Sequence, residues 1–363
     1  MAEAKIRNEI IKLTSDLIRF KSIKSEPNEL YKIINFIIKY FSKDQSKLII
    51  KKYNKNKKPS IVILPKGVKK PKLLFLSHAD VVEAESEKDF IPKVQGNKLL
   101  GRGSADMKAG LAISMVLFKK YHKTKSIGLM ITTDEELGGH NGAGYVSKLY
   151  KTDFIIASEP TYLNIVIKEK GVIWLKLIAK GKACHGSRPW LGENAIDILI
   201  KTYEKLRKKF PHINKDCWET TMNLGVIQGG KAPNIVAPSA EMKIDIRYIE
   251  KYKALELVEQ IKKLVTDKRV KLEIIEAEPM MLTAENDKKV LLLAECFKEI
   301  TKRKASILKE HGASDARFFS ERKISCAVFG PSGHNYHGRN EYLDIDSTVK
   351  CYAVLERYVQ KHT

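Results

Sequence analysis

The sequence predicts an α/β fold in which a doubly wound mixed sheet is interrupted by a smaller α+β domain. Two patterns support this prediction. Up to about residue 160, short apolar runs alternate with amphipathic stretches of helical length, which is typical of a sheet with helices on both faces. From about residue 171 to residue 280, the expected order becomes β-α-β-β-α-β, which is the ferredoxin-like arrangement.

Residues 1–170 are expected to form the first segment of the domain that contains the doubly wound sheet, which we call the wound domain. Its helices should be amphipathic, and its inner strands should be nearly continuous apolar runs, because helices cover both faces of such a sheet. The expected helices are residues 5–20, 28–42 and 108–122, and the expected strands are residues 47–52, 60–64, 72–77, 127–133 and 153–158.

Residues 171–282 are expected to form the inserted domain, and residues 283–363 the second segment of the wound domain. Within the insertion we expect strands at residues 172–180, 221–227, 241–247 and 270–274, and helices at residues 193–209 and 253–265. After it we expect helices at residues 287–300, 315–320 and 347–360, and strands at residues 305–308 and 324–329. The wound domain is therefore discontinuous in sequence.

The formal net charge of +23 raises the question of nucleic-acid binding. The lysines are spread through the whole chain, and their runs flank expected strands, which is typical of solvated loops. No recognition motif or zinc-finger spacing accompanies them. We therefore expect no nucleic-acid partner, and the positive field instead favours an anionic substrate.

The sequence also bears on compartment. No apolar run approaches the roughly 20 residues that a membrane-spanning helix needs, so we expect no membrane partner. The first helical stretch mixes charged and apolar residues and does not resemble a signal peptide. The five cysteines are scattered without paired spacing, which favours free thiols in a reducing compartment. We expect a cytoplasmic protein.

Acidic and histidine side chains follow several of the expected strands of the wound domain, and a glycine-rich loop, Gly101–Lys108, adds Asp106. Those that follow strands are His78, Asp80, Asp134, Glu135, Glu136, Glu159, His334, His337 and Glu341. Any single acidic turn could simply be solvated, but the carboxyl ends of parallel strands meet at one edge of a sheet. Two histidines and several carboxylates at one edge predict a metal site with two ions, and oxygen ligands mixed with imidazole suit zinc, cobalt or manganese.

Five short motifs at these positions follow one another in order: Ser-His78-Ala-Asp80, Gly-Arg-Gly-Ser-Ala-Asp106-Met-Lys, Thr-Asp134-Glu135-Glu136, Ser-Glu159-Pro and His337-x-x-x-Glu341. They resemble, in register, the motifs of a family of zinc metallohydrolases. That family includes acetylornithine deacetylase, succinyl-diaminopimelate desuccinylase, aminoacylase and carboxypeptidase G. The resemblance covers nearly the whole chain.

The resemblance implies a ligand set for two divalent metal ions. The implied ligands are His78 and Glu159 for one ion, Glu136 and His337 for the other, and Asp106 as the bridge between them. His334 competes with His337, because only two residues separate them, but the spacing around His337 fits the family pattern better. A short carboxylate such as Asp106 can span two ions about 3.5–4 Å apart with its two oxygens.

The resemblance also implies roles for two acids near the ions. Glu135 would be the general base, and Asp80 would hydrogen-bond the second ring nitrogen of His78. These residue types suit the roles, because neighbouring side chains on an extended backbone point in different directions. Glu136 can then reach an ion while Glu135 faces the substrate. A ligating histidine commonly donates its other N–H to a carboxylate.

By the same resemblance, the inserted domain would serve as a lid and as the interface of a homodimer. His185, in the turn Gly181–Pro189, would reach the facing subunit's site and stabilise an oxyanion. Arg247, Asn234 and Ser314 lie in segments that resemble substrate contacts, and a planar guanidinium can hold a carboxylate in two hydrogen bonds. Structural interpretations remain open for both cationic residues: a simple turn for His185, and a surface arginine on an edge strand for Arg247.

The strand-end residues predict a site for two divalent ions, zinc first and cobalt or manganese as alternatives, and the resemblance implies a metal-dependent amidohydrolase that removes a succinyl or acetyl group from an amino acid. The expected substrate is a small anionic N-acyl amino acid or dipeptide. A carboxypeptidase or dipeptidase on the same site is the alternative enzyme. A basic nucleic-acid-binding protein with a structural metal site is the alternative from another class, and salt-sensitive retention on DNA without hydrolysis would favour it.

Overall fold

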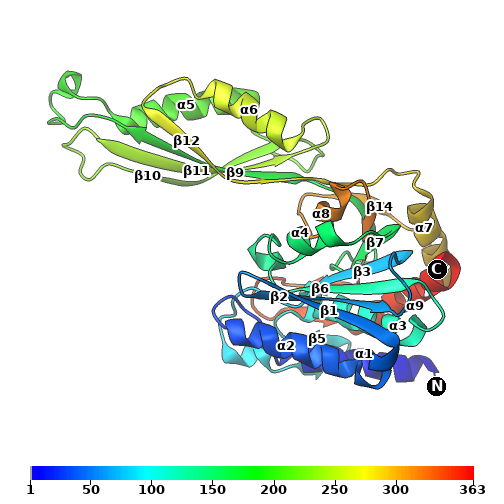
Figure 1. Ribbon diagram of the computed structural model, residues 1–363. Coiled ribbons are helices and arrows are strands. Elements are labelled where there is room, and N and C mark those ends of the chain that lie inside the picture. The colour runs from blue at the N-terminus through cyan, green and yellow to red at the C-terminus, as the bar shows by residue number, and fades with distance from the viewer. Residues whose placement is uncertain (1) are drawn as a thin grey trace. The chain divides into compact units, whose positions relative to one another are not determined.

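The computed structural model describes residues 2–363, which divide into two compact units (Figure 1). The larger unit contains the residues up to Lys168 together with Met281–Lys309 and Ser314–Thr363. The smaller unit contains Glu169–Met280 and the short segment Glu310–Ala313. The insertion expected from the sequence spanned residues 171–282, and it did not include the segment at residue 310.

A mixed sheet forms the centre of the larger unit, with strand order β1-β2-β6-β3-β7-β15-β8-β13 and with β14 paired to β8. The strands are β1 (Leu48–Lys55), β2 (Lys58–Pro65), β3 (Leu73–His78), β6 (Ile127–Thr132), β7 (Phe154–Ala157), β8 (Ile165–Glu169), β13 (Met281–Leu282), β14 (Ile307–Glu310) and β15 (Ser325–Val328). The four neighbours β6, β3, β7 and β15 pair in parallel, whereas β2 and β8 flank them as antiparallel strands. The predicted mixed sheet is confirmed.

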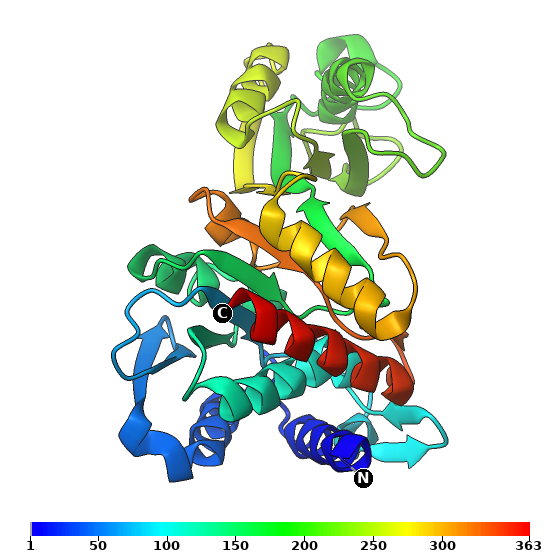
Figure 2. The same ribbon diagram turned by 90° about the vertical axis from the view of Figure 1, so that its right-hand side faces the viewer.

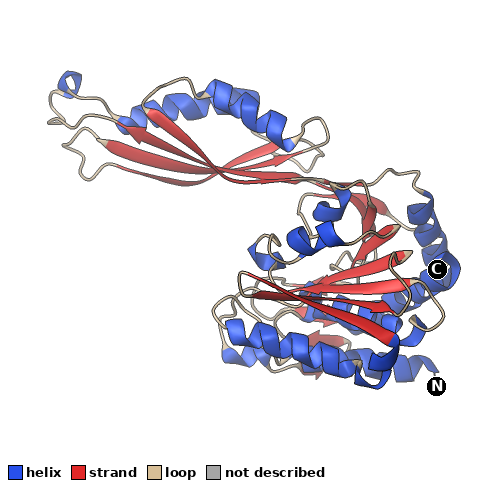
Figure 3. Cartoon of the chain, viewed as in Figure 1, coloured by secondary structure: helices blue, strands red, loops and turns tan. Residues whose placement is uncertain are grey.

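Helices cover both faces of this sheet, as predicted for a doubly wound fold, but the helices on one face are longer and more numerous than those on the other (Figures 1 and 3). One face packs against five long helices: α1 (Ala2–Ile18), α2 (Pro27–Tyr40), α3 (Ala109–Tyr121), α7 (Lys288–Thr301) and α9 (Ile345–His362). Figure 2 shows α3, α7 and α9 side by side on this face. The other face is covered by only two short helices, α4 (Ala143–Val146) and α8 (Arg317–Ser320).

Alternate side chains of each inner strand point to opposite faces of the sheet, and the side chains on both faces are buried. Ile127, Leu129 and Ile131 of β6 point into the core beneath the long helices, whereas Met130 points into the core beneath α4 and α8. Because both sets are buried, the strand is an almost unbroken apolar run in the sequence. The acidic turn after β6 leads into α4, a single helical turn, which is much shorter than the helices that usually connect parallel strands in a doubly wound sheet.

A second, small sheet brings distant parts of the larger unit together. Its order is β16-β17-β5-β4, with β16 (Gly333–His334), β17 (Tyr342–Asp344), β5 (Lys98–Leu100) and β4 (Lys93–Gln95). The pairing of β17 with β5 joins the segment around residue 343 to the start of the glycine-rich loop at Gly101. The sequence did not predict these strands, because each has only two or three residues and carries no clear alternation.

The smaller unit has the ferredoxin-like order predicted from the sequence. Its elements are β9 (Gly171–Lys180), α5 (Ala195–Lys209), β10 (Thr221–Gly229), β11 (Ser239–Tyr248), α6 (Ala254–Leu264) and β12 (Val270–Glu278). The sheet order is β10-β11-β9-β12, and every neighbour is antiparallel. The apolar sides of α5 and α6 pack on one face of this sheet and form a separate core, with Leu199 and Ile261 at its centre.

Two further features bear on the expectations about compartment. Within residues 2–363, none of the helices combines the length and the hydropathy that a membrane-spanning segment needs. All five cysteines carry free thiols, and Cys296, Cys326 and Cys351 are buried.

The close approach of α3 to β7 gives a test of the packing that supports the site. A Cβ atom added at Gly110 would lie 1.9 Å from the main-chain oxygen of Ser158, the residue before Glu159. We expect Gly110→Ala to destabilise the protein by about 1–3 kcal/mol or more, as overpacking does, although alanine favours an isolated helix. Gly312→Ala is the matched control, because nothing lies within 4 Å of its added Cβ. Chemical denaturation measures both, and a Gly110→Ala variant as stable as the wild type would contradict this packing.

Candidate metal centre

The parallel strands bring the acidic and histidine side chains to one edge of the large sheet. His78 is the last residue of β3, Glu135 and Glu136 follow β6, and Glu159 follows β7. Since β3 lies between β6 and β7 and runs parallel to both, all three strands end at the same edge. The carboxyl edge of a parallel sheet is where α/β proteins bind their ligands.

Asp106 lies between the two histidines. It belongs to the glycine-rich loop between β5 and α3, and its Oδ1 lies 3.3 Å from Nε2 of His78. Its other oxygen, Oδ2, lies 3.3 Å from Nε2 of His337. One carboxylate therefore presents a different oxygen to each imidazole, which is the arrangement required of a ligand that bridges two ions.

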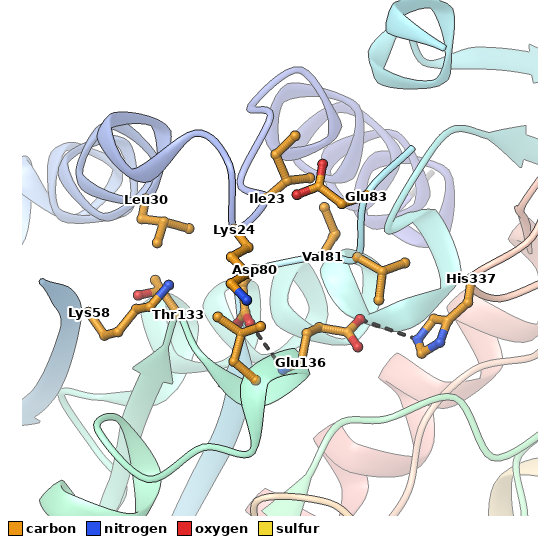
Figure 4. Close-up of a pocket in the computed structure, with 12 residues that line it drawn as sticks. Ile23, Lys24, Leu30, Lys58, Asp80, Val81, Glu83, Thr133, Glu136 and His337 are labelled. Carbon is orange, nitrogen blue, oxygen red and sulfur yellow. Dashed lines mark hydrogen bonds and ion pairs between the residues drawn. The ribbon is translucent and has the colours of Figure 1, made fainter. Parts of the chain in front are cut away.

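Each imidazole also faces one further carboxylate. Nε2 of His78 lies 3.5 Å from Oε2 of Glu159, and Nε2 of His337 lies 3.3 Å from Oε1 of Glu136 (Figure 4). Ligand atoms of His78, Asp106 and Glu136 all lie within 4.8 Å of one another. The cluster thus consists of two half-sites, each with one histidine and one glutamate, that share Asp106.

The spacing of these atoms fits divalent ions. Two nitrogen or oxygen ligands bound tetrahedrally at about 2.0–2.2 Å lie roughly 3.3–3.6 Å apart, and the four distances fall between 3.3 and 3.5 Å. Direct hydrogen bonds to nitrogen are shorter, at about 2.7–3.2 Å. The donor set contains imidazole and carboxylate and no cysteine, which suits zinc, cobalt or manganese.

The carboxylates of the cluster favour positive charge between them, as the raised pKa values of both histidines show. Asp106 and Glu136 raise the pKa of His337 to about 10. Burial alone would lower the pKa of His78, but Glu159, Asp106 and Asp80 outweigh it and raise that pKa well above the usual value. Without ions the site therefore holds protons tightly. A divalent cation would have to displace them, so its binding should release protons.

Glu135, which precedes Glu136 in the acidic turn, holds a proton more readily than an ordinary glutamate. Burial, together with the charges of Asp315, Glu159 and Glu136, raises its pKa well above the usual value for a glutamate, although His78 opposes this shift. Figure 4 shows Glu136 directed at His337. The two adjacent glutamates therefore present one side chain to the histidine and one that holds a proton readily.

Asp80 supports His78 differently from the expectation. Nδ1 of His78 lies 3.0 Å from the main-chain oxygen of Asp80, and 3.6 Å from its carboxylate Oδ1. The main chain thus provides the direct hydrogen bond, and the carboxylate acts on the imidazole mainly through its charge. Its other oxygen, Oδ2, accepts a hydrogen bond of 3.1 Å from the main-chain N–H of Glu136. Asp80 therefore ties the loop after β3 to the acidic turn after β6.

Asp134 lies behind the cluster and orders the acidic turn. It is 1% exposed, and its Oδ2 accepts a hydrogen bond of 2.8 Å from the N–H of Asn141. A Cβ at Gly142 would lie 2.2 Å from its Oδ1, so glycine is required there. Of the three consecutive acids, only Glu135 and Glu136 are available to the site.

The two competing histidines lie in different surroundings. The ring of His334 stacks on Tyr342, with centroids 5.0 Å apart, and meets the ring of Tyr162 at 5.4 Å. His334 belongs to β16, whereas His337 lies in the turn that follows and faces Asp106 and Glu136. The geometry therefore places His337 in the cluster.

A pocket of about 350 Å³ opens beside the cluster (Figure 4). Asp80, Glu136 and His337 are among the residues that line it. Its remaining walls are largely apolar, with two lysines and one glutamate, and consist of Ile23, Lys24, Leu30, Lys58, Val81, Val82, Glu83, Thr133 and Leu137. Sequence reasoning did not single out Lys24 or Lys58, because neither belongs to a motif.

The residues expected to contact substrate are distributed over both units. Ser314 lies in the larger unit and is 3% exposed. His185, Asn234 and Arg247 lie in the smaller unit. The Nε and Nη2 atoms of Arg247 donate to the carboxylate of Asp245 at 3.0–3.1 Å, and its strand, β11, is an inner strand, so the edge-strand interpretation was wrong. Substrate contacts by these four residues remain predictions.

The sheet edge, the shared carboxylate and the paired histidines form a candidate site for two divalent metal ions. Residues 74–361 match the model of Peptidase family M20/M25/M40, and the chain belongs to that family. This match confirms the family inferred from the five motifs, and with it a metal-dependent hydrolase of amide bonds.

Individual relatives differ in their described activities. The chain is 30% identical to a succinyl-diaminopimelate desuccinylase of Pelagibacter ubique, over 97% of this chain and 98% of that protein. It is 28% identical to a probable carboxypeptidase of Talaromyces marneffei, over 71% of this chain and 63% of that protein. Among solved structures, an M20 family metallo-carboxypeptidase from Sulfolobus solfataricus aligns with a TM-score of 0.82 at 18% identity, covering 98% of this chain and 99% of the other.

Separate alanine substitutions of His337 and His334 test which of the two histidines binds metal. We expect His337→Ala to weaken zinc binding by more than the roughly 10- to 100-fold typical of groups that only support a ligand, because one half-site loses its imidazole. His334→Ala is the matched control and should bind zinc like the wild type. Competition with a chromophoric chelator measures both affinities. Equal losses in the two variants, or none in His337→Ala, would exclude the assignment of His337.

Proposed function

We propose that the protein is a dinuclear-metal amidohydrolase that removes an N-acyl group, succinyl or acetyl, from an amino acid. The observation that carries the proposal is the position of Asp106, whose two oxygens face two different histidines at 3.3 Å. The full-length similarity to a desuccinylase supports the deacylase chemistry. The proposed ligands are His78 and Glu159 for one ion, Glu136 and His337 for the other, and Asp106 for both.

The chain's own residues would manage orientation and proton transfer. Two divalent ions held by these residues would supply Lewis acidity toward the amide carbonyl and would lower the pKa of the attacking water. Glu135 would take a proton from that water as its oxygen bonds to the carbonyl carbon, and would pass the proton to the amine as the C–N bond breaks. This role suits a buried carboxyl group with a raised pKa. Glu136 and Asp80 fix the turn that carries Glu135.

The pocket beside the cluster suits an acyl chain that ends in a negative charge. Its apolar walls can enclose methylene groups, and Lys24 and Lys58 supply positive charge. The carboxylate of Glu83, in the loop after β3, accepts hydrogen bonds from the N–H of Ser25 at 3.2 Å and from its Oγ at 3.1 Å, and this contact with the loop between α1 and α2 partly satisfies its charge. A succinyl group would therefore bind here better than an acetyl group. The net charge of +23 would also favour the approach of an anionic substrate.

A carboxypeptidase or dipeptidase would use the same metal cluster, and the similarity to a probable carboxypeptidase favours this second candidate. The two candidates differ in what leaves the site: an acyl acid and an amino acid, or two amino acids. From the scattered cysteines and the charged first helix we also propose a cytoplasmic location. The resemblance of the motifs supports a homodimer in which His185 acts in the facing subunit's site. Zinc is the proposed metal, with cobalt or manganese as alternatives.

A substrate panel tests the proposed function. Metal-loaded protein should hydrolyse N-succinyl amino acids faster than N-acetyl amino acids and dipeptides, and a chelator should abolish the activity. Lys58→Met should lower kcat/KM for the succinyl substrate by roughly 10- to 150-fold, since a hydrogen bond to a charged group contributes about 1.5–3 kcal/mol, and should leave the acetyl substrate unchanged.

The matched control for that substitution is Lys52→Met on β1, which lies outside the pocket. Hydrolysis of dipeptides alone would favour the peptidase. Full activity of protein shown by elemental analysis to be free of metal would exclude both candidates.

Neutral substitutions of the two adjacent glutamates should have different effects on rate and on metal binding. Glu135→Gln should keep its metal but lose rate by roughly 10²–10⁴, the usual contribution of a general acid–base group. Glu136→Gln should lose metal affinity first, and excess metal should restore part of its rate. Measurement of kcat and metal content across a zinc titration distinguishes the two. The division of roles fails if both variants lose metal equally.

A further inference from the structure

The loop that carries Asp106 is held by a residue from the other end of the chain. The carboxylate of Glu341 has a relative side-chain exposure of 2%, and it forms an ion pair of 2.9 Å with Arg102, which is 239 residues away in sequence. Its main-chain oxygen also accepts a hydrogen bond of 3.0 Å from Gly101 N–H. Glu341 thus contacts the glycine-rich loop through both its main chain and its side chain.

Every donor around this carboxylate belongs to that loop. Oε2 accepts from the N–H of Gly103 at 2.8 Å as well as from Arg102 Nη1. Oε1 accepts from the N–H of Ala105 at 3.0 Å and from the N–H of Asp106 at 3.1 Å. Both oxygens are therefore occupied as acceptors, so Glu341 is turned away from the cluster and toward the main chain that carries Asp106.

Arg102 connects the same carboxylate to the second histidine. Its Nη2 donates a hydrogen bond of 3.1 Å to the main-chain oxygen of Gly338, the residue after His337. The side chain of Arg102 is 3% exposed. One buried ion pair thus fixes the backbone at Asp106 and the backbone beside His337, the two residues whose side-chain atoms lie 3.3 Å apart in the cluster.

We propose that Glu341 and Arg102 are positioning residues that set the place of Asp106 between the two half-sites and so determine metal affinity. The proposal rests on the metal site of the proposed function. A carboxylate with two acceptor oxygens is required, because N–H donors face both of them. The amide of glutamine would direct an NH₂ group at two of these donors and leave them without an acceptor. Lysine in place of Arg102 would lose the planar fork that reaches Glu341 and Gly338 together.

The variants Glu341→Gln and Arg102→Lys test the proposal in the full-length protein. Each should bind zinc about 10- to 100-fold more weakly, the usual effect of losing a partner that orients a ligand. Each should also change the visible absorption spectrum of the cobalt-loaded protein, because the ligands around the ions move. The Arg102→Lys variant keeps the charge pair and provides the readout even where Glu341→Gln does not fold.

The matched control is Asp344→Asn, a nearby carboxylate that caps α9 through Ser347 N–H at 2.7 Å and accepts a hydrogen bond of 3.1 Å from Asn97, which precedes the glycine-rich loop. It should lower the unfolding temperature but keep wild-type zinc affinity and the wild-type cobalt spectrum. Folded Glu341→Gln or Arg102→Lys protein with unchanged affinity and spectrum would overturn the proposal, even if its stability fell. Failure of the wild type to bind two metal ions would instead overturn the metal site itself.

Discussion

The carboxylate of Asp106, shared between two imidazoles, is the contact on which the arrangement of the site depends. Its two oxygens each lie 3.3 Å from a different histidine nitrogen. Burial would raise the pKa of Asp106, but the facing imidazoles of His337 and His78 lower it below the usual value, so the group remains ionised. Glu159, by contrast, has a pKa raised to about 7, chiefly by burial. Carboxylates gathered this closely repel one another, and the fold has to hold them together until cations bind.

The sheet supplies most of that restraint. Parallel pairing of β3 with β6 and β7 fixes where His78, the acidic turn and Glu159 begin, and two apolar cores hold the strands from both faces. The remaining two cluster residues, Asp106 and His337, lie on loops, which have no strand to fix them. The small sheet and the ion pair of Arg102 with Glu341 provide the restraint there. The strands and the two linked loops thus hold the five side chains so that the four histidine–carboxylate distances all lie between 3.3 and 3.5 Å.

Much of the fold followed from periodicity, because long apolar runs and the β-α-β-β-α-β order are strong signals. The strands β4, β5, β16 and β17 could not be predicted, since two or three residues show no alternation. A metal site was predicted because histidines and glutamates follow strands that share an edge, and Asp106 was assigned from the motif of the glycine-rich loop. Support of His78 by Asp80 was predicted, but through the carboxylate and not the main-chain oxygen, and the contact of Glu341 with the glycine-rich loop was not predicted. A motif does not reveal whether a side chain or a main-chain atom makes a contact. Lys58 was missed because a pocket wall assembled from separate segments has no sequence pattern. The substrate-contact roles of His185 and Arg247 remain predictions.

The central claim is that Asp106 bridges two metal ions, and anomalous X-ray diffraction from crystals of zinc-loaded protein tests it most directly. Data collected on both sides of the zinc absorption edge locate the ions independently of the protein atoms. The account predicts two peaks about 3.5–4 Å apart, one between His78 and Glu159 and one between Glu136 and His337, with an oxygen of Asp106 facing each. A single peak, or two peaks that Asp106 does not join, would contradict it.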